Sequence, residues 1–125
     1  MSDAATGGVQ FDKLFASIDR MDTESFLSFL SSDCVFRFGS AAPVTGHDAI
    51  RATVDEFFAM FAALKHDIHR TVTEANAVVC EGEVTYTRHD GSAITVPFAN
   101  IFEIDSGLIS LYRIYIDIGP VFAES

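Results

Sequence analysis

Residues 78–91 read VVCEGEVTYTRHDG and carry the strongest signal for a sheet in the chain. Within them, residues 80–87 alternate small or apolar side chains with Glu and Thr, as in a strand that has one buried and one solvated face. Asp90 and Gly91 follow at once, and Asp-Gly between two β-rich runs is a strong signal for a hairpin. The stretch therefore predicts a long strand that turns back into an antiparallel sheet.

The segments on either side extend this pattern. Downstream of residue 65 the apolar period is two, broken only by short turn-like segments, whereas upstream the apolar residues recur at helical spacing. Three helices around one strand, followed by an antiparallel meander, predict an α+β fold with the helices on one face of the sheet. The expected helices cover residues 9–21, 22–32 and 47–61, and the expected strands cover 34–39, 65–74, 77–88, 92–104 and 108–117.

Length and composition exclude several classes of protein. The 125 residues predict a single domain over residues 9–125 after a disordered start at residues 1–8. A formal net charge of −10 disfavours nucleic-acid binding, which depends on Lys and Arg at phosphates. Neither a signal peptide nor an apolar run long enough to span a membrane is visible. Cys34 and Cys80 stand in apolar runs, so we expect buried thiols in a reducing cytoplasm.

Three stretches, in this order, resemble the SnoaL-like branch of the nuclear transport factor 2-like superfamily. They are SSDCVFRFGSAAPVTGHDAI at 31–50, the strand and hairpin at 78–91, and VPFANIFEIDSGLISLYRIYID at 96–117. The resemblance implies a cone-shaped, curved antiparallel sheet packed on three N-terminal helices around an apolar pocket. It also implies a homodimer formed through the sheet. Ketosteroid isomerases, limonene-epoxide-hydrolase-like enzymes and polyketide cyclases share this fold, so the fold assigns no activity.

The ketosteroid isomerase pattern is only partly present. The resemblance would put its carboxylate base near Phe38, its oxyanion acid near Asn100 and its donor tyrosine near Leu14. A phenyl ring takes no proton and an isobutyl group donates none. Only Asn100 retains a hydrogen-bonding group, so steroid-isomerase chemistry is not supported.

The epoxide hydrolase pattern has a closer counterpart. Arg88 and Asp90, together with Asp117 at the end of the last strand, resemble the Arg-x-Asp and Asp set of those enzymes. Two departures weaken the match: Asp90 also fits a turn, and Phe36 and Phe38 occupy the positions of the residues that orient water. Asp117 has two interpretations, because it either enters the pocket as an acid or base or caps the end of its strand.

Histidine supplies the remaining candidate chemistry. His66 and His69 are three residues apart on one strand and so face opposite sides, and the resemblance turns His66 toward the pocket as a base or donor. We therefore expect no metal site and no cofactor. The candidate catalytic residues are Asp117, His66, Arg88 and Asp90. The expected pocket lining is Phe36, Phe38, Phe58, Asn100, Phe102, Arg113 and Tyr115.

Two classes of function remain open on these grounds. One is acid–base catalysis on a small hydrophobic molecule, of an isomerase, cyclase or epoxide-hydrolase-like kind. The other is a non-catalytic module that binds a ligand or forms a dimer. A pocket with two or more polar groups facing each other favours the enzyme, and a purely apolar pocket favours the binding protein.

Overall fold

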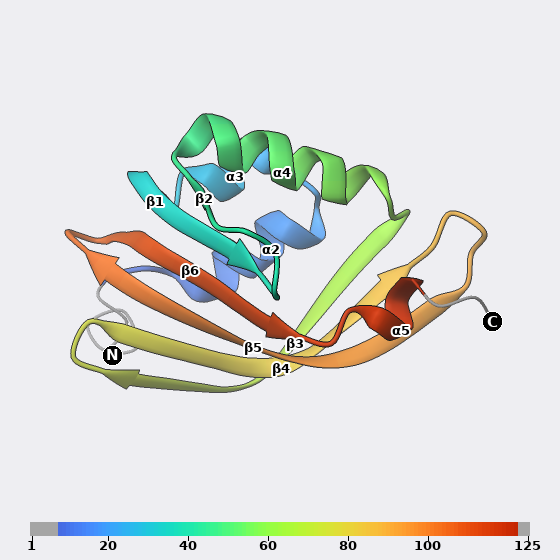
Figure 1. Cartoon of the computed structure of the whole chain (residues 1–125). Helices are drawn as coiled ribbons and strands as arrows, with labels where there is room; N and C mark the ends of the chain where they lie inside the picture. The colour runs from blue at the N-terminus through green and yellow to red at the C-terminus, as the bar shows by residue number, and fades with distance from the viewer. Residues whose placement is uncertain (1–7, 123–125) are drawn as a thin grey trace.

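The computed structural model describes residues 8–122, so the disordered start expected over residues 1–8 lies almost wholly outside the described residues. It confirms an α+β fold with a curved, open sheet (Figure 1). The elements in chain order are α2 (Phe11–Asp19), α3 (Thr23–Leu27), β1 (Leu30–Phe38), β2 (Val44–Thr45), α4 (His47–Ala59), β3 (Ala63–Glu74), β4 (Ala77–Thr87), β5 (Ala93–Asp105), β6 (Leu108–Ile116) and α5 (Gly119–Phe122).

The sheet has six strands in the order β2-β1-β6-β5-β4-β3. Strands β3 to β6 form the predicted antiparallel meander. Strand β1 differs, because it lies parallel to β6, with Phe36 opposite Tyr112. Parallel neighbours need a long connection, which α4 and the meander supply here. The two-residue edge strand β2 and the last helix α5 were not predicted.

Helices α2, α3 and α4 all cover the same face of the sheet, as Figure 1 shows. Helix α2 packs its aromatic side chains on β5, where the Phe11 and Phe102 ring centroids are 4.7 Å apart. Helix α3 is shorter than predicted but starts at the predicted cap, because Asp22 Oδ1 accepts a hydrogen bond from the Ser25 N–H. Helix α4 buries Ile50, Val54 and Phe58.

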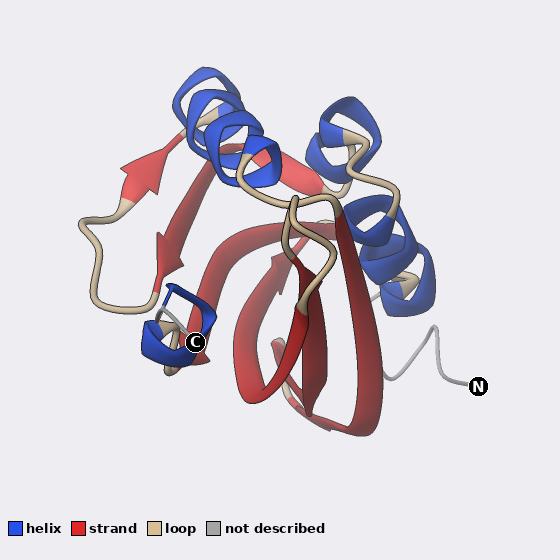
Figure 2. Cartoon of the chain, turned by 90° about the vertical axis from the view of Figure 1, so that its right-hand side faces the viewer, coloured by secondary structure: helices blue, strands red, loops and turns tan. Residues whose placement is uncertain are grey.

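A glycine and a bulge allow the sheet to bend. Strand β3 pairs Ile68 with Gly82 and then Arg70 with Glu81, so His69 is an extra residue in the ladder. An alanine Cβ at position 82 would lie 2.0 Å from the Asp67 carbonyl oxygen, which shows how closely β3 folds over β4. Figure 2 shows the resulting curl of the sheet around the space beneath the helices.

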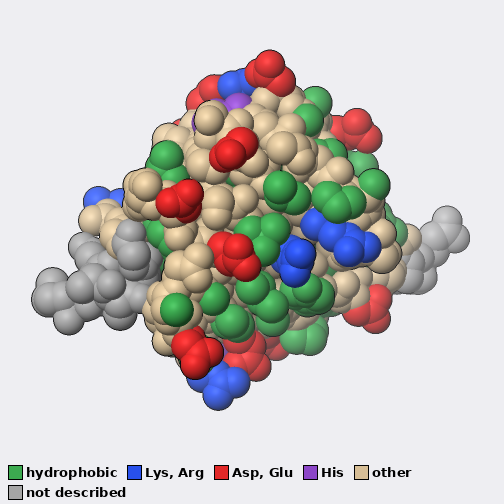
Figure 3. All heavy atoms as spheres, turned by 60° about the vertical axis from the view of Figure 1, so that its left-hand side comes forward, with side chains coloured by type: hydrophobic (Ala, Val, Ile, Leu, Met, Phe, Trp, Pro, Cys, Tyr) green, Lys and Arg blue, Asp and Glu red, His purple; other side chains and the backbone are tan. Residues whose placement is uncertain are grey.

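No helix in the part of the chain from 8 to 122 is long and apolar enough to cross a membrane. Figure 3 shows one face of the molecule, on which the basic side chains stand among acidic and hydrophobic ones instead of forming a stripe. On this face the basic side chains offer no continuous electrostatic track for a phosphate backbone.

Candidate functional site

A cavity of about 300 Å³ lies between α4 and the concave face of the sheet. Its wall is mainly aromatic and aliphatic, with side chains from β1, α4, β5 and β6. Thr53 and Glu56 of α4 add polar groups to this wall, and four further side chains with hydrogen-bonding groups come from the sheet. They are His66 on β3, Tyr86 on β4, Asn100 on β5 and Tyr112 on β6. An apolar cavity with a few convergent polar groups is typical of small-molecule sites.

His66 forms a pair with Asp19, the last residue of α2. Asp19 Oδ1 lies 2.6 Å from His66 Nδ1, and both carboxylate oxygens lie 3.1 Å from the His66 backbone nitrogen. A carboxylate only accepts hydrogen bonds, so Nδ1 is the donor. The two side chains are 12% and 18% exposed. Nε2 has no hydrogen-bond partner within residues 8–122, and His66 is one of the residues that line the cavity.

Asp19 was missing from the predicted site. It stands at the C-terminal end of its helix, where the partial negative charge of the backbone disfavours a carboxylate. Two N–H groups of a single residue offset this cost. The signal was present in the sequence: Asp19 follows Phe15 by four residues and so shares the inward face of the helix. The Phe15 ring, also on α2, contacts the imidazole of His66, with the two ring centroids 5.1 Å apart.

The two tyrosines of the cavity can act as hydrogen-bond donors. Burial raises the pKa of both the Tyr86 and Tyr112 hydroxyls above their ordinary value, so both stay protonated near neutral pH. Neither hydroxyl has a hydrogen-bond partner among the described residues. Tyr86 packs against Phe57 and Phe61, and Tyr112 packs against Phe26 and Phe36.

The structure places four of the seven residues expected in the lining at the cavity and three elsewhere. Phe36, Phe38, Phe58 and Asn100 line the cavity. Phe102 is fully buried behind it. Arg113 and Tyr115 are exposed on the outer face, because β6 turns Tyr112, Ile114 and Ile116 inward.

The sequence from residue 11 to residue 112 matches the model of the SnoaL-like domain. The chain belongs to this family. Among curated proteins, none matches the sequence.

Solved structures similar to this SnoaL-like domain agree in fold at low sequence identity. A protein of ketosteroid isomerase-like fold from Catenulispora acidiphila is 16% identical with a TM-score of 0.83, over 92% of this chain and 90% of that one. A SnoaL-like polyketide cyclase from Jannaschia is 19% identical with a TM-score of 0.78, over 89% of this chain and 85% of that one. An epoxide hydrolase of M. tuberculosis is 18% identical with a TM-score of 0.74, over 86% of this chain and 80% of that one. At these identities the likeness shows the fold alone.

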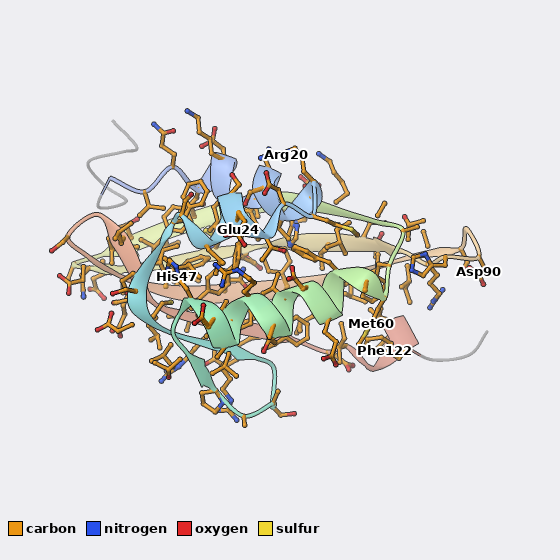
Figure 4. All side chains as sticks on the ribbon, turned by 90° about the horizontal axis from the view of Figure 1, so that it is seen from above. Arg20, Glu24, His47, Met60, Asp90 and Phe122 are labelled. Carbon is orange, nitrogen blue, oxygen red and sulfur yellow. The ribbon has the colours of Figure 1, made fainter. Side chains whose placement is uncertain are left out.

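The hydrolase-like set of this SnoaL-like domain does not meet in the cavity. Arg88 donates to the carbonyl oxygens of Pro120 and Val121 and to Ser92 Oγ, which ties the β4–β5 hairpin to α5. Asp90 Oδ1 accepts from the Ser92 N–H and hydroxyl, as a turn residue does. Figure 4 shows Asp90 at the tip of its hairpin, beyond the end of α4.

Asp117 has the capping role that the sequence left as one of two interpretations. It is exposed just after β6, and its Oδ1 accepts a hydrogen bond of 3.1 Å from the Gly119 N–H at the start of α5. Like Arg88 and Asp90, it is absent from the cavity lining. Of the four candidate catalytic residues, the structure brings only His66 to the cavity.

Within residues 8–122, one group of side chains outside the cavity has ligand atoms close enough to hold a metal. Asp67, His69 and Glu83 place one such atom each within 4.8 Å of one another on the exposed side of β3 and β4. His69 already contacts both carboxylates.

Cys34 and Cys80 are buried free thiols, and burial raises the pKa of Cys34 to about 12.

Proposed function

We propose that this SnoaL-like protein is an enzyme that moves a proton on a small hydrophobic ring compound, with His66 as the base. The observation that carries the proposal is the Asp19–His66 pair, which leaves Nε2 without a hydrogen-bond partner among the described residues, at the wall of a mainly apolar cavity. The His66 hydrogen bond to Asp19 fixes the tautomer in which Nε2 has a free lone pair.

The chemistry follows from the two ends of the imidazole. Nε2 takes a proton from a carbon next to a carbonyl group, and the Asp19 carboxylate stabilises the imidazolium that forms. The developing oxyanion needs a neutral donor, which a Tyr86 or Tyr112 hydroxyl can supply. The proton then returns from Nε2 to another atom, which gives an isomer. If the enolate carbon instead attacks a second carbonyl group of the same molecule, a C–C bond forms, the π bond of that carbonyl breaks, and the resulting alkoxide takes the proton from Nε2, which closes a ring.

Two further observations support this class of substrate. The cavity volume equals that of about ten water molecules in the liquid, which suits a molecule of one or two rings. A structure of similar fold from Jannaschia is described as a SnoaL-like polyketide cyclase, and polyketides are rich in carbonyl groups and acidic C–H bonds. The hydrolase alternative has less support, because its Arg and Asp residues lie outside the cavity.

Hydrogen–deuterium exchange into 2-tetralone tests the proposal. Proton NMR in D₂O follows the loss of the hydrogens next to the carbonyl, with wild-type protein, with His66→Gln and with His69→Gln as the matched control. His69 lies on the same strand but is exposed on its other side. We expect wild type and His69→Gln to exchange well above the buffer rate, and His66→Gln to lose about 10²- to 10⁴-fold.

Two outcomes would decide against catalysis by His66. If His66→Gln exchanges as fast as wild type, another group is the base. If wild type binds 2-tetralone with no exchange above buffer, the protein is the non-catalytic ligand-binding module. Titration of the ketone against each variant separates these results from a simple loss of binding.

The homodimer through the sheet stays a prediction, and the outer face supports it. Val72, Val79, Ile101 and Arg113 are direct neighbours across four strands, and three of the four are apolar. Val72 is 49% exposed. A second copy of the chain packed on this row would cover apolar surface and leave the cavity on the opposite face accessible.

A further inference from the structure

Asn100 is a polar residue in an apolar row. It lies on the concave face of β5 at only 2% exposure and contributes to the cavity wall. Its neighbours along the same face of the strand are Phe98 and Phe102. Across the sheet it stands opposite Cys80 on β4 and Ile114 on β6. Nothing in this frame of side chains is a strong hydrogen-bonding group.

The Asn100 amide has no partner within the described part of the chain. Its Oδ1 is buried and accepts no hydrogen bond. Buried side-chain amides are nearly always hydrogen-bonded, and an exception of this kind calls for an explanation, of which a bound molecule is one. Because the four nearest side chains on the sheet supply no strong donor, we infer that a molecule in the cavity is the partner. An apolar residue would pack at least as well here, so the fold itself does not require asparagine.

We propose that Asn100 selects ligands that carry a hydroxyl group, by accepting a hydrogen bond from that hydroxyl at Oδ1. This inference names the substrate class for the function proposed above and rests on it, since both place the ligand in the same cavity. An amide oxygen is satisfied only by a donor, so a ketone or an ether at this position leaves it unpaired. A phenol, an enol or a ring alcohol provides the donor and keeps the remaining surface apolar.

The roles of His66 and Asn100 then differ. His66 stands on β3 next to Asp19 and contacts Phe98 edge-on, with ring centroids 5.4 Å apart. Asn100 is the next residue after Phe98 on the concave face of β5. A two-ring compound that rests on Phe98 therefore has its reacting carbon toward the imidazole and its hydroxyl toward the amide. Asn100 is in this sense a specificity residue, and His66 is the catalytic one.

A pair of matched ligands tests the assignment. 2-Naphthol and 2-methoxynaphthalene share one ring system, but only the naphthol donates a hydrogen bond. Each is titrated by fluorescence against wild type, Asn100→Leu and His66→Gln. We expect wild type to bind 2-naphthol about tenfold more tightly, Asn100→Leu to bind the two with nearly equal affinity, and His66→Gln to keep the preference.

Stability measurements provide the control for folding. Because Asn100→Leu removes a buried amide without a partner, its thermal midpoint should equal or exceed that of wild type. A lower midpoint would mean that the amide has a structural partner and would overturn the proposal. Asn100→Val, which suits a β-strand, provides a second variant if the leucine does not fit.

The outcomes also separate this inference from the proposed function. A naphthol preference that survives in Asn100→Leu, or that vanishes in His66→Gln instead, overturns the role of Asn100 alone. Equal binding of both naphthalenes by wild type does the same. No binding of either compound counts against the cavity as a ligand site, and with it against both proposals. An intact preference with no ketone exchange supports Asn100 and contradicts catalysis by His66.

Discussion

Asp19→Asn is expected to lower the rate of exchange into 2-tetralone by about 10²- to 10⁴-fold while the protein stays folded. The carboxylate accepts from two donors of His66, the backbone N–H at 3.1 Å and Nδ1 at 2.6 Å. An asparagine has one acceptor and one donor. If its oxygen accepts from the backbone N–H, its NH₂ faces Nδ1 and stabilises the tautomer that carries the proton on Nε2. That tautomer cannot take a proton from the substrate.

The matched control is Asp12→Asn. Asp12 lies on the same helix, is exposed, and loses the same charge. We expect it to exchange 2-tetralone at the wild-type rate. An Asp19→Asn protein that is folded, binds the ketone and exchanges it at the wild-type rate would show that the carboxylate does not orient the base. The double variant with His66→Gln should be no slower than His66→Gln alone, because the two residues act as one unit.

Gly82→Ala is expected to lower the free energy of unfolding by about 3 kcal/mol or more. The added Cβ would lie 2.0 Å from the Asp67 carbonyl oxygen and 3.0 Å from the Ile68 Cα, and both are backbone atoms. A flexible side chain could move aside, but here β3 itself must shift. The measurement is urea unfolding followed by circular dichroism.

Gly107→Ala provides the comparison for this glycine. Gly107 lies in the β5–β6 turn with a φ of +80° and has no described atom within 4 Å of an added Cβ. Its cost comes from backbone conformation alone and should be about 1–2 kcal/mol. A loss at Gly82 no larger than the loss at Gly107 would contradict the close approach of β3 and β4. Because His66 is two residues from the displaced Ile68, Gly82→Ala should also disturb the pair with Asp19.

Local patterns predicted most of the elements and one member of the site. The alternation in β4 set its buried face correctly, and Asp22 capped its helix as expected. Strand parity separated His66 from His69, and the family resemblance implied that His66 is the one that faces the pocket. Such features depend on neighbours in the chain, which the sequence displays directly.

The features that were missed depend on contacts between distant residues. Asp19 and His66 are 47 positions apart, so no spacing rule connects them. The facing of β6 is set by pairing, with Tyr112 opposite Phe102, because the strand carries large side chains on both faces. For the same reason the sequence could not show that Arg88 ties its hairpin to α5. These contacts become visible only once the strands are paired and the helices are placed on the sheet.

The tautomer of His66 is the most direct property to measure. Long-range ¹H–¹⁵N correlation spectra, recorded at a pH where the ring is neutral, distinguish a protonated Nδ1 from a protonated Nε2. We predict a proton on Nδ1, an unprotonated Nε2, and a shift of the Nε2 resonance when 2-tetralone is added. A proton on Nε2 in the free protein, or an Nε2 resonance unmoved by saturating ketone, would contradict a base held by Asp19 and aimed into the cavity.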